Sequence, residues 1–177
     1  MIENFTLTRL SLDAVIKPFD CANEQLNGFL FDDAKNHVKL LLAVTYILES
    51  EEETIAYFSV LNDSIRIEDT TKNHFKKIIK ILPFKKRYKS HPAVKVGRFA
   101  VNHKYQGQRI GSELMDYIKG YFLDNNKTGC RFITLDAENN ERTIKFYQKN
   151  GFDFLTTKDE GEENRLMFFD LIYFSAR

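Results

Sequence analysis

The run GRFAVNHKYQGQRIGS, residues 97–112, is the most informative part of the chain. Its first five residues are typical of a β-strand, and its polar, glycine-bearing middle leads into the first turn of a helix at Gly111 and Ser112. The first turn of a helix carries N–H groups without an intrahelical partner and the positive end of the helix dipole. This stretch therefore predicts an anion site suited to phosphate.

The rest of the composition is that of an ordinary globular domain. The chain has 177 residues, of which 43% are hydrophobic and 29% charged. That length suits one domain over residues 1–177. The 26 basic and 25 acidic side chains give a net charge of +1, which argues against wholesale binding of polyanions but leaves room for a local basic patch.

The sequence carries no recognisable membrane or export signal. No apolar run approaches the roughly 20 residues of a membrane span, and the first residues are not basic and then apolar. The cysteines, Cys21 and Cys130, are far apart and read as small, partly buried, reduced thiols. We therefore expect a cytoplasmic protein with no membrane partner.

Strand and helix patterns follow one another along the chain. The predicted strands are residues 5–10, 41–48, 54–61, 94–101, 132–135, 152–156 and 166–174. The predicted helices are one capped within 20–23 and running to about His37, a short amphipathic one between Phe75 and Pro83, one over 110–122, and one capped by Asn139 and stopped by Gly151. This order favours an α/β fold, a mixed sheet with helices on both faces.

Two motifs in this order resemble those of the GNAT superfamily of acetyl-CoA-dependent N-acetyltransferases. The first motif is Gln or Arg, two residues, Gly or Ala, one residue, Gly or Ala; here it falls on Gln106, Arg109 and Gly111. The second is the run 139–152, an Asn followed by a Phe-Tyr pair and then Gly-Phe. The resemblance spans nearly the whole chain. It implies the GNAT fold, with a mixed, mostly antiparallel central sheet of six to seven strands.

The same resemblance implies how acetyl-CoA binds as co-substrate. Its pantetheine arm would lie where two parallel strands splay apart, held by backbone groups of Phe99 and Val101 and by Asn139. Its pyrophosphate would be held by the loop and the first helical turn. The residues implied there are Gln106, Gly107, Gln108, Arg109, Gly111 and Ser112.

Arg109 departs from the family pattern, which usually has a small residue at this position. Backbone N–H groups that hold a phosphate tolerate a side chain that points outward, and an arginine could add a charge-assisted bond. An arginine that instead crowds the pyrophosphate would weaken cofactor binding. Because its flexible stem can leave the groove, we expect tolerance.

Tyr147 is the predicted catalytic residue. When an amine attacks the thioester, CoA leaves as a thiolate and needs a proton, which a tyrosine of pKa about 10 can supply at neutral pH. Helical periodicity alone favours a ring packed beside Ile144. The resemblance places a tyrosine acid at this motif position and reverses that preference.

The general base stays open, and no metal is expected. Asp136 and Glu138 flank the end of a central strand, but alternation does not say which one faces the cleft, and an amine of lowered pKa needs no base from the enzyme. The four histidines are scattered without metal-ligand spacing, so we expect no metal. The chain also lacks G-x-G-x-x-G after an early strand and G-x-x-x-x-G-K-[ST].

A narrower resemblance concerns the acceptor. The run FDCANEQLNGFL, residues 19–30, together with residues 97–101 and 105–108, resembles the acetyltransferase toxins of bacterial toxin–antitoxin pairs. That group implies acetylation of aminoacyl-tRNA and silencing by a small antitoxin. Residues 72–95 contain many lysines and no acidic residue, which suits tRNA phosphates but also suits a solvated helix face and loop.

Two alternatives remain beside the toxin reading. One keeps the chemistry but acetylates a small amine or a protein amine. The other is a degenerate fold that binds acyl-CoA or a protein without catalysis, which Arg109 keeps open. Aromatic residues near the end of the chain permit a homodimer without requiring one.

Overall fold

The computed structural model describes residues 2–71, 75, 76, 78 and 88–174. They form two compact units. The first contains Met1–Leu61 and Val96–Ile118, and the second contains Asn62–Lys95 and Lys119–Arg177. The expectation of a single domain over 1–177 stays a prediction. The basic segment predicted over residues 72–95 lies partly outside the described residues, which leave out its arginine and most of its lysines. Ile79, Leu82 and Pro83 of the predicted short amphipathic helix also lie outside them.

Seven strands are hydrogen-bonded in the order β1-β2-β3-β4-β5-β7-β6. Their bounds are Thr6–Arg9, Val44–Glu49, Thr54–Arg66, Ser90–Val101, Phe132–Glu138, Asp153–Phe154 and Asn164–Asp170 for β1 to β7. The pairs β1·β2, β2·β3, β5·β7 and β6·β7 are antiparallel, whereas β4·β5 is parallel. The predicted α/β fold with a mixed, mostly antiparallel sheet is confirmed.

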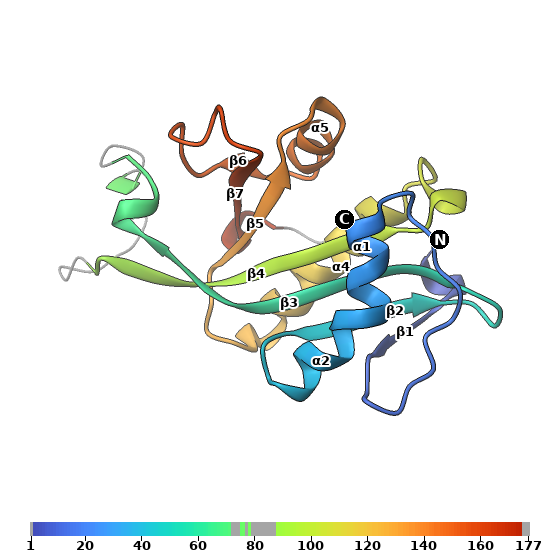
Figure 1. Cartoon of the computed structure of the whole chain (residues 1–177). Coiled ribbons are helices and arrows are strands. Elements are labelled where there is room, and N and C mark those ends of the chain that lie inside the picture. The colour runs from blue at the N-terminus through green and yellow to red at the C-terminus, as the bar shows by residue number, and fades with distance from the viewer. Residues whose placement is uncertain (1, 72–74, 77, 79–87, 175–177) are drawn as a thin grey trace. The chain divides into compact units, whose positions relative to one another are not determined.

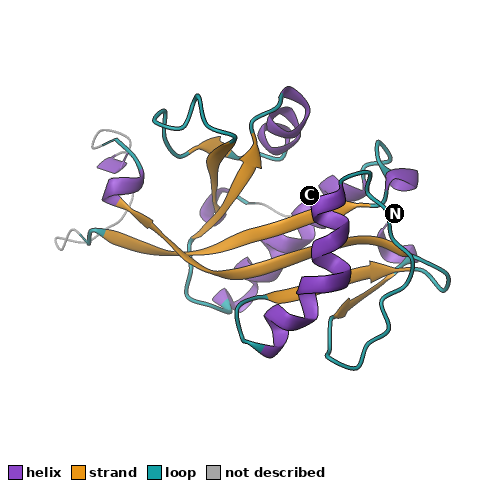
Figure 2. Cartoon of the chain, viewed as in Figure 1, coloured by secondary structure: helices purple, strands orange, loops and turns teal. Residues whose placement is uncertain are grey.

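A helical stretch covers one face of the strands in the first unit. It consists of α1 (Glu24–Gly28), a π-helical turn (Phe29–Asp33) and α2 (Ala34–Lys39). The cap, which was predicted within residues 20–23, is Asn23; its side chain accepts from the Leu26 N–H at 3.1 Å. Figures 1 and 2 show this stretch in front of the strands, and behind them the part of α4 (Ile110–Leu123) that belongs to this unit.

The core of the first unit joins that helical stretch to the strands. The Tyr57 hydroxyl on β3 donates to the Leu26 carbonyl at 2.7 Å, and its ring stacks on Phe29 with centroids 6.2 Å apart. The apolar side chains packed there are Leu10, Phe19, Cys21, Phe29, Leu30, Ala34, Ile47, Tyr57 and Ala100. Strand alternation therefore aims one face of β2 and β3 at the helix.

The second unit has its own core and carries α5 (Glu141–Lys149). Its buried apolar cluster comprises Ile65, Phe75, Ile78, Ala93, Phe132 and Leu155. The Arg131 guanidinium binds both carboxylate oxygens of Asp170, at 2.8 and 2.7 Å, where β5 begins and β7 ends. This bidentate pair fixes the register of the two strands at that edge.

Several predicted strand boundaries differ from the structure, for example the start of β4 at Ser90 rather than at residue 94. Strand β3 runs to Arg66 rather than to residue 61, and β7 ends at Asp170 rather than at residue 174. The carboxylate of Asp170 accepts from the Ile172 N–H at 3.2 Å and begins a 3₁₀ turn, Leu171–Tyr173, that takes the chain out of the sheet. Within the described part of the chain, no helix has the length and apolarity needed to cross a membrane.

Candidate active site

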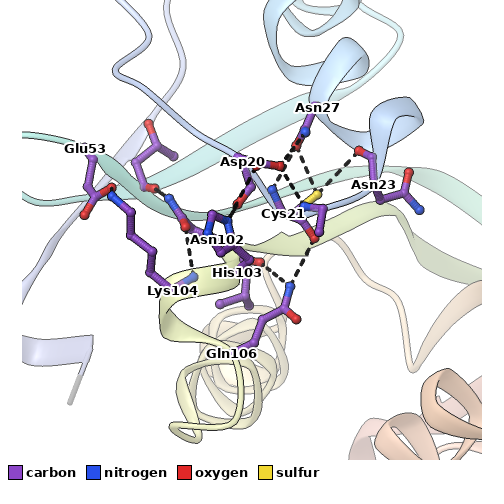
Figure 3. Close-up of polar contacts among 12 residues, drawn as sticks. Asp20, Cys21, Asn23, Asn27, Glu53, Asn102, His103, Lys104 and Gln106 are labelled. Carbon is purple, nitrogen blue, oxygen red and sulfur yellow. Dashed lines mark hydrogen bonds and ion pairs between the residues drawn. The ribbon is translucent and has the colours of Figure 1, made fainter.

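Polar contacts hold the loop that follows β4 against other parts of the first unit (Figure 3). Asn102 is only 2% exposed; its side chain accepts from the Lys104 N–H and donates to the Thr54 carbonyl at 3.2 Å. The His103 N–H donates to the Asp20 carbonyl at 2.8 Å. The loop therefore leaves the strand in one fixed direction.

Glu53 holds the same loop from the turn between β2 and β3. Its carboxylate accepts from Lys104 Nζ at 2.7 Å and from the Tyr105 hydroxyl at 2.9 Å. The hydrogen bond from Lys104, followed by that from Tyr105, holds the pKa of Glu53 below its ordinary value. Sequence reasoning missed this anchor, because Glu53 is 51 and 52 residues from its two partners and no local pattern signals the contact.

Gln106 also stabilises the loop. Its side-chain amide donates to the Val101 carbonyl at 2.9 Å and to the Cys21 carbonyl at 3.2 Å. The motif glutamine thus ties the end of β4 to the segment that leads into α1, as Figure 3 shows. Phe99 and Val101 lie near the end of β4, half-buried and buried respectively.

Two residues of the loop have left-handed backbone conformations. Gly107 has φ +79° and Arg109 has φ +67°. Glycine adopts such angles freely, whereas an L-residue with a Cβ is strained there. The preference of the motif for a small residue at position 109 therefore has a backbone cause. The Arg109 side chain is exposed, the orientation that tolerance requires.

The start of α4 offers backbone donors beside that loop. The first intrahelical bond runs from the Glu113 N–H to the Arg109 carbonyl at 3.0 Å, so the amides of Ile110, Gly111 and Ser112 precede it. A Cβ added at Gly107 would meet no atom within 4 Å. Open space, donor amides and a positive helix end fit a pyrophosphate.

Tyr147 lies on α5 in the second unit and is 8% exposed. Its ring makes edge contacts with Phe146 and Phe152, at centroid distances of 5.1 and 5.7 Å. Burial, and secondarily the nearby charge of Glu138, raises the pKa of the Tyr147 phenol, which keeps it protonated. Packing of the Tyr147 ring, which periodicity favoured, therefore does not conflict with a phenol that keeps its proton, as a general acid requires.

The Tyr147 hydroxyl is not sealed within the core. Among the described residues, His91 Nε2 is the one buried side-chain nitrogen or oxygen without a hydrogen-bond partner. The Tyr147 hydroxyl has no partner among these residues either, so it must keep some exposure.

Asn139 does not cap α5, so that prediction was wrong. The cap is Asn140, whose side chain accepts from the Thr143 N–H at 2.9 Å. The Asn139 amide instead donates to the Glu160 and Glu162 carbonyls, at 3.1 and 2.8 Å. Its N–H donates to the Glu163 carbonyl, which places residue 139 outside the helix and fixes the acidic turn.

The two candidate bases both have partners. Asp136 forms an ion pair with Lys95 at 2.5 Å, and Glu138 accepts from the Asn140 side chain at 3.0 Å. Among the described residues, no group of three or more His, Cys, Asp or Glu side chains could hold a metal ion. Cys21 and Cys130 are free and buried, and burial raises the pKa of the Cys21 thiol.

The site therefore consists of a glycine-bearing loop and the first amides of α4, which follow β4, a strand paired in parallel with β5. Such a site in an α/β fold suits a phosphorylated ligand. A family model described as an acetyltransferase (GNAT) domain matches residues 43–153. The chain belongs to the GNAT family of acetyltransferase domains.

Solved structures of bacterial toxins are similar over nearly the whole chain. The AtaT toxin complexed with acetyl-methionyl-tRNAfMet is 26% identical, with 94% of each chain covered and a TM-score of 0.76. A tyrosine-to-phenylalanine mutant of KacT is 23% identical, with 96% of each chain covered and a TM-score of 0.78. A tyrosine-to-phenylalanine mutant of AtaT bound to the C-terminus of the antitoxin AtaR is 23% identical, with coverages of 95% and 92% and a TM-score of 0.73.

Proposed function

We propose that this acetyltransferase moves the acetyl group of acetyl-CoA to the α-amine of an aminoacyl-tRNA. The observation that carries the acceptor is the similarity to AtaT, a toxin complexed with acetyl-methionyl-tRNAfMet, at 26% identity over 94% of both chains. Membership of the GNAT family supports the chemistry. The resemblance of residues 19–30 to toxin acetyltransferases points the same way.

Acetyl-CoA is the proposed co-substrate, and AtaT has been determined with it bound. The amides between Gln106 and Ser112 would hold its pyrophosphate, because they precede the first bond of α4 and face open space at Gly107. Backbone groups of Phe99 and Val101 would hold the pantetheine arm, and the contact of Asn139 with that arm, which the family resemblance implies, stays a prediction. Arg109, exposed at its strained position, would leave the backbone donors accessible.

Tyr147 is the proposed general acid. The neutral amine attacks the thioester carbonyl and forms the C–N bond, the C–S bond breaks, and the departing thiolate takes the phenolic proton. The nitrogen of the new amide loses its extra proton to water, and the Tyr147 phenolate takes a proton back from water before the next turnover. A positioned acid of this kind contributes roughly 10²–10⁴ in rate. The α-amine of an aminoacyl ester is less basic than a lysine, so a fraction is neutral without help from Asp136 or Glu138.

The proposed setting is bacterial translation in the cytoplasm, with a small antitoxin as the silencing partner. AtaT, which shares the fold, binds the C-terminus of its antitoxin AtaR. A free acetyltransferase acting on charged tRNA would stop growth, so a partner that blocks it is expected beside it. A homodimer remains a prediction.

The test is the transfer of radiolabel from acetyl-CoA to charged total tRNA, with wild type compared with Tyr147→Phe. Label on the aminoacyl amine, reduced about 10²-fold or more by the substitution, is the expected result. Label on polyamines or lysine side chains but not on tRNA would replace the acceptor with a small or protein amine. Binding of acetyl-CoA without transfer to any acceptor would mean that the protein is a degenerate GNAT fold that binds acyl-CoA without catalysis.

A further inference from the structure

Lys119 is a lysine of α4 buried in the second unit, with only 3% of its surface exposed. Its Nζ lies over the rings of Phe169, Phe174 and Phe152, at 4.6, 5.6 and 5.7 Å from their centroids. The same nitrogen donates to the Asn150 carbonyl at 2.6 Å. An ammonium is costly to bury, so this arrangement calls for an explanation beyond packing.

The group that Lys119 binds is the C-terminal end of α5. Asn150 closes that helix, and its N–H donates to the Phe146 and Tyr147 carbonyls at 3.1 and 3.0 Å. A positive charge is favourable there, because the helix dipole places partial negative charge on the last carbonyls. Lys119 thus completes the end of α5 from a different helix.

The end of α5 is a Schellman motif in which Tyr147 takes part directly. Gly151 has φ +82°, the Phe152 N–H donates to the Tyr147 carbonyl at 3.0 Å, and the Gly151 N–H donates to the Gln148 carbonyl at 2.9 Å. The accompanying apolar contact is between the rings of Phe152 and Tyr147. The backbone and the ring of Tyr147 are therefore both held by this motif.

We propose that Lys119 is a positioning residue for Tyr147, acting through the Asn150 carbonyl and the Phe152 ring. The inference rests on the proposed function, in which Tyr147 is the general acid. Lys119 touches two parts of the motif at once: its ammonium binds the carbonyl that follows α5 and lies over the ring packed on Tyr147. Small displacements of an acid lower turnover without changing how substrates bind.

The experiment compares kcat and KM for acetyl transfer in wild type, Lys119→Met and Lys119→Arg. Methionine keeps the apolar stem and removes the charge and the donor. We expect Lys119→Met to lower kcat about tenfold or more while leaving KM for acetyl-CoA unchanged, because only the position of the acid is affected. Arginine keeps the charge and the donors and should restore part of that loss.

A double-mutant cycle separates positioning from general damage to the fold. In a Tyr147→Phe background, Lys119→Met should cost little further in kcat, because the acid it positions is already gone. The matched control is Lys127→Met, which removes another lysine that lies over an aromatic ring, that of Tyr121 at 4.8 Å, and that pairs with Asp124 rather than with a residue of α5. It should turn over at the wild-type rate.

The outcomes distinguish the inference from the function on which it rests. Wild-type kcat in Lys119→Met, or an equal loss with and without Tyr147, would overturn the positioning role. Failure of the proposed function would show in proteins that still have Lys119: the wild type would transfer no acetyl group, or Tyr147→Phe would work at full rate. Either result would refute the assignment of Tyr147 as the acid, and the inference about Lys119 with it.

Discussion

Arg109 is the residue whose replacement tests the cofactor loop most directly. Its φ of +67° costs about 1–2 kcal/mol for a side chain with a Cβ. Glycine removes that strain but adds about 0.5–1 kcal/mol of unfolded-chain entropy. We expect Arg109→Gly to stabilise the protein by about 0.5–1 kcal/mol, raising Tm by about 1–4 °C. Thermal melting measures this.

The control for that substitution is Arg109→Ala, which removes the long side chain but keeps the Cβ, so its Tm should not rise. Acetyl-CoA affinity, measured by calorimetry, should change less than about threefold in both variants, because the exposed arginine stem lies clear of the backbone donors. Binding tightened by orders of magnitude in Arg109→Gly would mean that the arginine crowds the phosphate.

The ionisation of Tyr147 gives a prediction for the pH profile. Burial raises its pKa above the ordinary tyrosine value, so the protonated, donating form persists to higher pH. Wild-type kcat should therefore show no fall attributable to this phenol up to about pH 10. Rates measured between pH 7 and 9.5 in wild type and Tyr147→Phe test it. A fall confined to wild type in that range would show a phenol of lowered pKa.

The position of the loop between β4 and α4 depends on Glu53, which lies in the turn between β2 and β3. Glu53→Gln removes the charge that binds Lys104 and Tyr105, and we expect KM for acetyl-CoA to rise about two- to fivefold, the scale of an exposed ionic anchor. Steady-state kinetics measures this. Glu51→Gln, an exposed carboxylate in the same turn, should leave KM at its wild-type value.

The same anchor has a defined pH dependence. Because the folded pKa of Glu53 is lowered, its stabilising contribution is complete above its ordinary value of 4.5 and disappears as pH falls through the lower folded value. The Tm difference between wild type and Glu53→Gln should therefore be constant near neutral pH and vanish in acid. A Tm difference that grows as the pH falls would contradict a lowered pKa for Glu53.

Much of the architecture could be predicted from periodicity, while the details that position side chains could not. The spacing of Leu26, Phe29 and Ala34 predicted the first helix, but it gave no sign of the π-helical turn at Phe29–Asp33. Asn139 and Asn140 are equally suitable caps by composition. The choice between them is made by a bond from the Asn139 N–H to Glu163, across 24 residues.

Long-range contacts explain what the sequence could not show about the site. Lys119 reads as an ordinary polar position of an amphipathic helix, and its burial depends on Phe152, Phe169 and Phe174, which lie far along the chain. The motif showed that Arg109 departs from the family pattern. The positive φ that explains the family's preference for a small residue there could be seen only in the backbone of the structure. Tyr147 was assigned by resemblance, since periodicity alone favoured a packed ring.

The charge of the molecule as a whole bears on tRNA binding. With a net charge of +1, affinity for a polyanion must come from a local basic surface. We expect affinity for aminoacyl-tRNA to fall about twentyfold to a hundredfold between about 50 and 200 mM salt, the loss for roughly three to five phosphate contacts. Filter binding over that range measures the slope.

Lys89 tests where that surface lies, because it is exposed and belongs to the basic stretch 72–95. Lys89→Gln should reduce the salt slope by about one contact. Lys145→Gln, which removes an exposed lysine of α5 paired with Glu141, should leave the slope unchanged. A tRNA affinity that does not respond to salt, with transfer to a small amine intact, would remove tRNA as the acceptor while leaving the acetyl chemistry in place.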